Sequence, residues 1–198
     1  MKKWVTAALL IPGLISSGAY ALDLTPHEII VGNDGPPAKR YFFQDEGKRL
    51  SLRIDNKMTV SGTSDSIAFG FSDIKSAGMK LWKSPVQPAL RFDGKNLEAY
   101  RTAARALLPP DAINIQLEEE KAEAIAINGW TSQQFIFSYS VLGSTIRRAI
   151  TFLNLRAQEQ IVFEITAAAA DYQKTYARGY RVLNSIAELP ANSASGPT

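Results

Sequence analysis

The chain has 198 residues, of which 22 are basic, 19 are acidic, one is histidine and none is cysteine. The absence of cysteine excludes disulfide bonds, thiol nucleophiles, lipid attachment at a cysteine and thiolate-based zinc sites. The formal net charge of +3 falls to about +1 when residues 1–21 are set aside, and so small an excess does not favour a nucleic-acid partner.

The first 21 residues are ordered like a secretory signal peptide. Lys2 and Lys3 precede an apolar stretch from Trp4 to Ile15, and Ala19 and Ala21 fit a small-x-small cleavage site. The stretch is too short for a membrane span, and a buried N-terminal helix is the alternative interpretation. We expect export to the periplasm or secretion, and no membrane span once the signal is removed.

The rest of the chain predicts one domain at residues 39–189, long enough to bury a core without disulfides. Residues 22–38 contain two glycines and three prolines and are expected to form a lead-in loop. Residues 190–198, "PANSASGPT", are small and polar and predict a disordered tail.

The first half of the domain predicts short strands followed by a helix. The expected strands are residues 40–44, 49–55 and 66–71, of which "RLSLRID" alternates apolar and polar side chains. Residues 72–94 are rich in glycine and proline and predict a long connection with a short strand at 79–82. A helix is then expected from Leu97 to Leu108, with Asp93 or Asn96 as its cap.

The second half predicts a meander of antiparallel strands. Asn128-Gly129 suits a two-residue type I′ turn between strands at 122–127 and 130–141, because both residues tolerate positive φ. Trp130 is then expected to pack across the hairpin. The remaining expected strands are residues 113–118, 145–155 and 159–167.

The chain from about Ala168 predicts an amphipathic helix. Its expected apolar stripe consists of Tyr172, Tyr176, Tyr180, Leu183 and either Ile186 or Ala187. Arg178 and Arg181 fall outside that stripe and are expected in solvent, while Gly179 indicates a close approach to a sheet. We expect Phe135, Phe163 and Tyr176 to share one interior, in an α+β sandwich of a mainly antiparallel sheet and two amphipathic helices.

The order of elements over residues 126–186 resembles that of the PsbP/Mog1/DcrB-like proteins, many of which are small exported or lumenal factors. The stretches that carry the resemblance are "INGW", "QQFIFSYSVLG", "IRRAITFLNL", "EQIVFEITA" and "YRVLNSI". The resemblance covers about a third of the chain. It implies the same fold and a binding or assembly role, and it transfers no active-site residue.

No motif predicts a catalytic, cofactor-binding or metal-binding residue. A Ser-His-acid triad would have to use His27, which lies in the lead-in segment. Ser72 to Lys75 fits S-x-x-K, but in a predicted loop and without the partner motifs of the serine acyl-enzymes. Glu118, Glu119, Glu120 and Glu123 could suggest a cation site, but consecutive strand residues point to opposite faces, so this run does not converge on one cation.

Two sets of residues remain candidates for function. Glu159, Glu164 and Asp171 could supply an acid pair for glycoside chemistry, which their separation would decide. A cationic-aromatic patch for an anionic or sugar-like ligand could consist of Trp82, Trp130, Tyr139, Arg147 and Arg148. Solvated strand charges are the alternative interpretation of the arginines.

The sequence thus favours a non-catalytic, exported binding or accessory protein without a cofactor, whose partner in the cell envelope is an unknown protein or small molecule. The sheet face or the connection at residues 72–94 is the expected binding surface. A small envelope hydrolase using carboxylates or a serine, and a structural subunit of an envelope complex, are the alternatives.

Overall fold

The computed structural model describes residues 22–31, 38–86, 90–125, 129–156 and 159–189. The predicted signal peptide at 1–21 and the predicted tail at 190–198 lie outside the described residues, as does Asn128 of the predicted turn. Within the described residues, neither helix is long and apolar enough to cross a membrane.

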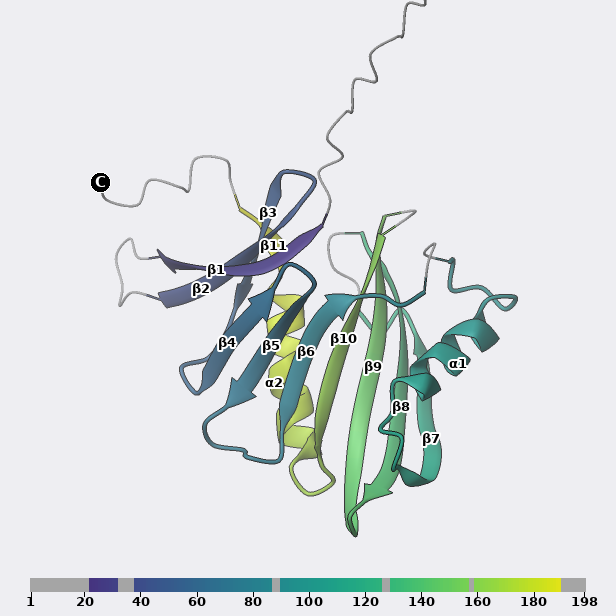
Figure 1. Ribbon diagram of the computed structural model, residues 1–198. Helices are drawn as coiled ribbons and strands as arrows, with labels where there is room; N and C mark the ends of the chain where they lie inside the picture. Colours follow the sequence, from purple (N-terminus) through teal and green to yellow (C-terminus); the bar gives the residue numbers. More distant parts are fainter. Residues whose placement is uncertain (1–21, 32–37, 87–89, 126–128, 157–158, 190–198) are drawn as a thin grey trace, which may run out of the picture.

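The strands form two antiparallel sheets (Figure 1). The larger sheet has the order β4-β5-β6-β10-β9-β8-β7, and the smaller one has the order β1-β2-β3-β11. The strands of the larger sheet are β4 (Met58–Thr63), β5 (Ser66–Phe71), β6 (Gly78–Lys83), β7 (Ile113–Ala122), β8 (Thr131–Val141), β9 (Ser144–Arg156) and β10 (Glu159–Ala168). Those of the smaller sheet are β1 (Asp23–Val31), β2 (Ala38–Asp45), β3 (Lys48–Arg53) and β11 (Ala187–Glu188).

Two helices pack on opposite faces of the larger sheet: α1 (Leu97–Ala106) on the side of β7 and β8, and α2 (Tyr172–Asn184) behind β5, β6 and β10 (Figure 1). The predicted α+β class is confirmed. Two apolar cores result, which we call the α1-side core, around Tyr100 and Phe152, and the α2-side core, around Phe163 and Val182.

The predicted shared interior of Phe135, Phe163 and Tyr176 is wrong. Phe135 lies in the α1-side core, whereas Phe163 and Tyr176 belong to the α2-side core. The central strands bury both faces, and β10 shows this directly because the successive residues Val162 and Phe163 are both buried on opposite sides. A strand with two apolar faces cannot be assigned to one helix from its alternation alone.

Residues Asp23–Val31 form β1 instead of the predicted lead-in loop. Leu24 is fully buried, and β1 pairs antiparallel with β2, with an irregular register between Asp23 and His27. Pro26 lies in that irregular stretch. Because proline is tolerated on edge strands and at bulges, the residue that suggests a loop is compatible with this strand.

The strand predicted at 122–127 is not formed at residues 123–125, and residues 126–127 lie outside the described residues. β7 ends at Ala122, β8 begins at Thr131, and the main-chain N–H of Glu123 still donates to the Ser132 carbonyl at 2.7 Å. Gly129 has the positive φ expected of a turn glycine, at 73°. Ser132 accounts for part of the difference, since its hydroxyl bonds both main-chain groups of Ile125 and holds that residue out of the ladder.

The predicted apolar stripe of α2 is buried at Tyr172, Leu183 and Ile186, whereas Tyr176 is partly buried and Tyr180 is exposed. The residues that the helix buries are Tyr172, Thr175, Arg178, Gly179, Val182 and Leu183. Tyr172, Tyr176 and Tyr180 form a row of rings along the helix, and successive ring centroids are 5.6 and 6.2 Å apart. The predicted close approach at Gly179 is confirmed, because a Cβ atom there would lie 2.6 Å from Ile165 Cδ1 and 2.7 Å from Met79 Sδ.

Arg178 is buried, contrary to the prediction that it faces solvent. Its side chain is 6% exposed and binds Asp55 and Asp73, while its guanidinium carbon lies 4.5 Å from the ring centroid of Phe71. Two carboxylates and an aromatic ring offset the cost of burying the charge. They come from connections distant in sequence, so no local pattern on α2 predicts this environment.

Candidate functional site

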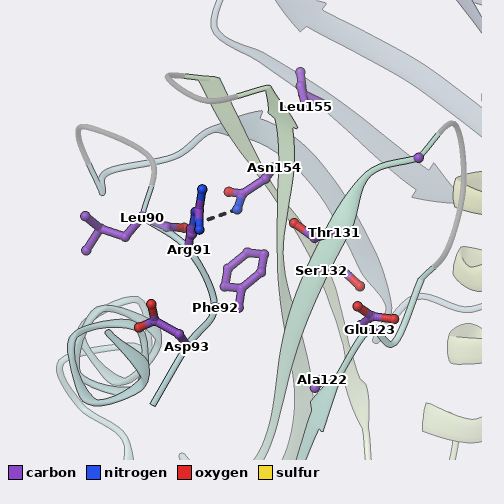
Figure 2. Close-up of a pocket in the computed structure, with 11 residues that line it drawn as sticks. Leu90, Arg91, Phe92, Asp93, Ala122, Glu123, Thr131, Ser132, Asn154 and Leu155 are labelled. Atoms are coloured by element: carbon purple, nitrogen blue, oxygen red, sulfur yellow. Dashed lines mark hydrogen bonds between the residues drawn. The ribbon is translucent and has the colours of Figure 1, made fainter. Parts of the chain in front are cut away.

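A cleft of about 610 Å³ lies at the end of the larger sheet where β8 begins and β9 ends. One wall is the segment 90–93, which leads into α1, and the other comes from Ala122, Glu123 and Thr131 (Figure 2). The ring of Phe92 stands between the walls (Figure 2). A volume of this size is in the range of small-molecule sites.

A buried polar network holds the segment 90–93 in place. The Tyr100 hydroxyl donates to the Leu90 carbonyl at 2.7 Å and accepts the Leu90 N–H at 2.9 Å. The Asn154 side-chain amide also donates to the Leu90 carbonyl, at 3.1 Å (Figure 2). A segment with few regular main-chain bonds is therefore attached to α1 and to β9 by side chains.

Gln160 connects this network to the rest of the sheet. Its amide nitrogen donates to the Tyr100 hydroxyl at 2.7 Å and to the Asn154 side-chain oxygen at 2.6 Å, and its oxygen accepts the Ser84 hydroxyl at 2.5 Å. Burial raises the pKa of the Tyr100 phenol, while the bonds to Gln160 and Leu90 oppose that rise. The phenol therefore stays neutral at ordinary pH and can act as donor and acceptor together.

The rim of the cleft carries charges of both signs. Arg91, Asp93 and Glu123 all line it and are exposed. Of the two predicted caps, Asn96 occupies the N-cap position of α1, whereas the Asp93 carboxylate accepts the main-chain N–H groups of Lys95 and Asn96 in the turn before the helix. Arg91 and Glu123 form no ion pair among the described residues, so they are available to a ligand with a negative and a positive end.

The predicted cationic-aromatic patch does not assemble. Arg147 and Arg148 are successive strand residues and face opposite sides of the sheet. Arg148 binds Glu164 at 2.5 Å, with Tyr139 beside it, whereas Arg147 pairs with Glu118 and lies 4.6 Å from the Tyr172 ring centroid on the α2 side.

The two tryptophans of that patch lie elsewhere. Trp82 packs against the α1-side core, with Lys80 5.0 Å from its ring centroid. Trp130 directly precedes β8 and packs against the α2-side core, where it lines a hollow with Leu50 of the smaller sheet and Leu155. The strand across which Trp130 was predicted to pack, at 122–127, lies partly outside the described residues.

The three carboxylates considered for glycoside chemistry do not converge. Glu159 and Glu164 are five residues apart on β10, which corresponds to roughly 16 Å along a strand and exceeds the spacing of either glycosidase mechanism. Asp171 precedes α2 and accepts the Ser76 hydroxyl at 2.8 Å. Glu118, Glu119 and Glu120 likewise pair with different cations, which are Arg147, Lys121 and Arg101.

The remaining predicted candidates have packing environments that do not suggest catalysis. His27 lies on β1 and stacks on Phe42, with ring centroids 5.0 Å apart. Ser72 follows β5 in a bend and donates to the Lys57 carbonyl at 3.1 Å, so it does not stand at a helix start.

Comparison with known proteins finds likeness only among solved structures, since neither a family model nor a curated protein matches. PsbP and Mog1 structures are among them. LpqN of Mycobacterium tuberculosis, described as involved in cell envelope biogenesis, is 13% identical with a TM-score of 0.49, over 83% of this chain and 92% of that one. The Ran-binding protein Mog1p of Saccharomyces cerevisiae is 9% identical with a TM-score of 0.48, over 82% and 93%.

Another similar structure is the cyanobacterial PsbP (CyanoP) of Synechocystis sp. PCC 6803. It is 13% identical with a TM-score of 0.43, over 90% of this chain and 99% of that one. These proteins are of the kind that the sequence resemblance names. The likeness is one of fold and assigns no ligand, partner or residue role to this chain.

Sequence reasoning missed the cleft, although it identified the connection that forms one wall. Phe92 and Arg91 stand among glycines and prolines with no periodicity to mark them. The signal that could have indicated the buried network is a pair of polar residues, Asn154 and Gln160, within otherwise apolar strands. Buried polar side chains need hydrogen-bond partners, so two of them close together suggest a network.

Proposed function

We propose that this chain is an exported, non-catalytic binding or accessory protein of the cell envelope, and that its binding site is the cleft beside Phe92. The ligand that suits the cleft is a short peptide segment with one apolar side chain. The observation that carries this proposal is the combination of a fixed aromatic ring between two walls with one cation and one anion at the rim. Export is supported by the signal-like order of residues 1–21.

The arrangement favours binding over catalysis. Among the described residues that line the cleft, Ser132 is the one buried hydroxyl, and it is bonded to the main chain of Ile125 rather than to a base. Nucleophilic catalysis needs such a base within hydrogen-bond reach. A peptide segment with an apolar side chain instead needs an apolar surface and charges at the rim, and the cleft provides these through Leu90, Phe92 and Leu155 and through Arg91 and Glu123.

The absence of cysteine permits a direct test. Thr131→Cys introduces a single thiol at the rim for a fluorescent label, which is titrated with tripeptides whose central residue is leucine, phenylalanine or lysine. We expect saturable binding of the leucine or phenylalanine peptide and at least about a tenfold loss of affinity in Phe92→Ala, equivalent to about 1.4 kcal/mol. The same label at Lys75→Cys is the control and should not respond.

Two results would contradict the proposal. One is that none of the tripeptides gives a saturable signal, and the other is that Phe92→Ala leaves binding unchanged. Export is tested separately by fractionating cells and determining the N-terminus of the mature protein by mass spectrometry. We expect it at Leu22, and an intact Met1 in the cytoplasmic fraction would exclude export.

A further inference from the structure

The outer edge of β4 differs from the other edge of the larger sheet. β7 carries Glu118, Glu119, Glu120 and Lys121, and its pairing with β8 has two register irregularities. β4 has the sequence MTVSGT, without a charged residue, and pairs with β5 in unbroken register. Charges and bulges protect an edge strand from pairing with another chain, and β4 has neither.

The hydrogen-bond alternation identifies which main-chain groups of β4 point outward. The Ser72 N–H donates to the Lys57 carbonyl at 2.9 Å, which extends the β4–β5 ladder by one pair. Bonded and non-bonded pairs alternate in an antiparallel ladder, so Thr59 and Ser61 face β5 while Met58 and Val60 turn their N–H and C=O groups outward. The Met58 N–H agrees with this, because it donates to the Asp55 carbonyl at 3.1 Å, away from β5.

A groove of about 690 Å³ runs along this edge. Met58, Thr59 and Val60 form one side, and Lys39 and Tyr41 of β2 form the other. Further along β4, Pro26 of β1 lies against Gly62, where a Cβ atom would be 3.0 Å from Pro26 Cδ. The accessible part of the edge therefore spans about four residues, or roughly 13 Å of extended chain.

The charged groups along the groove are paired within the chain. The Lys39 ammonium lies 2.9 Å from Glu28, whose carboxylate also accepts the Tyr41 hydroxyl at 2.8 Å. Asp55 is bound by Arg178 at 2.7 Å. A neutral occupant with small or branched side chains suits a groove with no uncompensated charge.

We propose that β4 is a docking edge for one extended, uncharged peptide segment of a partner protein, which adds a strand to the larger sheet through the main chain of Val60. The groove between β2 and β4 is the space that we assign to this single strand. The edge of a second folded copy would carry a neighbouring strand about 4.8 Å further out and would meet β2. This is β-strand addition, in which main-chain bonds supply affinity.

The test uses Val60→Pro, which removes the outward N–H and leaves the bonds to β5 in place, since proline is tolerated at such edge positions. The probe is the blocked pentapeptide acetyl-TVTVT-amide, added to labelled full-length protein and followed by amide hydrogen exchange. We expect the peptide to slow exchange at Val60 at least about tenfold and Val60→Pro to abolish binding while retaining the native circular dichroism spectrum. Ser61→Pro, which removes a bond to β5, is the matched variant and should unfold β4.

The cleft variant Phe92→Ala should bind the pentapeptide as the wild type does, which separates this edge from the cleft. Unchanged exchange at Val60 with saturating peptide would overturn the proposal, as would undiminished binding in a folded Val60→Pro variant. Protection of Val60 that rises with protein concentration alone would assign the edge to a second copy and would overturn the peptide assignment too. If the dichroism spectrum of Val60→Pro is changed, native tryptophan fluorescence verifies that the variant is folded. Binding of the peptide to wild type without protection of the Val60 amide would also contradict the proposal.

Discussion

The buried guanidinium of Arg178 on α2 forms an ion pair with the partly exposed Asp73 of the β5–β6 connection, in which Nη1 donates to Oδ1 at 2.7 Å. Nε and Nη2 of the same guanidinium donate to the two carboxylate oxygens of Asp55, at 2.8 and 2.7 Å. One side chain thus binds the β3–β4 connection and the β5–β6 connection to the helix. The β3–β4 connection leads into β4, and the β5–β6 connection follows β5, which pairs with β4. This cluster therefore supports the strand whose edge we propose for docking.

Replacing Arg178 with methionine should destabilise the protein by at least about 2 kcal/mol, because it removes three charge-assisted hydrogen bonds and leaves Asp55 and Asp73 without their shared partner. Urea unfolding monitored by circular dichroism measures the loss. Arg181→Met on the exposed side of α2 is the matched control and should stay within about 0.5 kcal/mol of wild type. Equal effects of the two substitutions would contradict a special role for Arg178.

The free energy of unfolding should depend on pH through the cluster of Arg178, Asp55 and Asp73. The bond from Arg178 lowers the pKa of Asp73; burial opposes ionisation of Asp55, but the bonds from Arg178 outweigh it, so its pKa is lowered as well. Groups with a lowered pKa in the folded state stabilise above their unfolded pKa near 3.8, and this contribution is lost as the pH falls through the folded pKa.

The free energy of unfolding of wild type should therefore decline below about pH 4. Asp73→Asn should be less stable than wild type at pH 6, and the difference should shrink between pH 4 and pH 2. Unfolding curves across this range measure it. A difference that is constant with pH would show that Asp73 acts through its shape and not through its charge.

Gly179→Ala should destabilise the protein by about 1 kcal/mol, although alanine favours helix. The new methyl group would lie 2.6 Å from Ile165 Cδ1, and overpacking of this kind costs about 1–3 kcal/mol against a gain of about 1 kcal/mol in helix propensity. Ile165→Val deletes that Cδ1 atom, so the double variant should be more stable than the sum of the single effects predicts. Thermal unfolding of the four proteins measures the coupling, and simple additivity would contradict the contact.

Tyr100→Phe should loosen the wall of the cleft. The substitution removes the hydroxyl that bonds both main-chain groups of Leu90 and the Gln160 amide, at a cost of about 1–3 kcal/mol. We expect faster hydrogen exchange of the Leu90 amide. We also expect a lower affinity for the leucine or phenylalanine tripeptide, measured with the fluorescent label at Thr131→Cys. Tyr180→Phe, whose hydroxyl is exposed, is the control, and an unchanged Leu90 amide in Tyr100→Phe would show that Asn154 alone holds the segment.

Local patterns were sufficient for the positions of most elements. Helix α1 ends before Pro109-Pro110, and the short strand predicted at 79–82 is β6, because proline and alternation act through the backbone of the residues that carry them. Local patterns were not sufficient to predict which site residues lie together. Arg147 and Arg148 are neighbours in sequence and lie on opposite faces, so adjacency along the chain did not imply a shared surface.

By itself, the sequence determined the α+β class, the meander from β8 to β10 and the glycine at which α2 approaches the sheet, since each depends on residues within one element or its turn. Only the tertiary structure decided that the sheet has two cores, that Arg178 is buried and that Leu90 is held by Tyr100, Asn154 and Gln160. These depend on contacts between segments up to 123 residues apart, as for Asp55 and Arg178. The free energy of such contacts comes from desolvation and from the partner, neither of which is a property of the local chain.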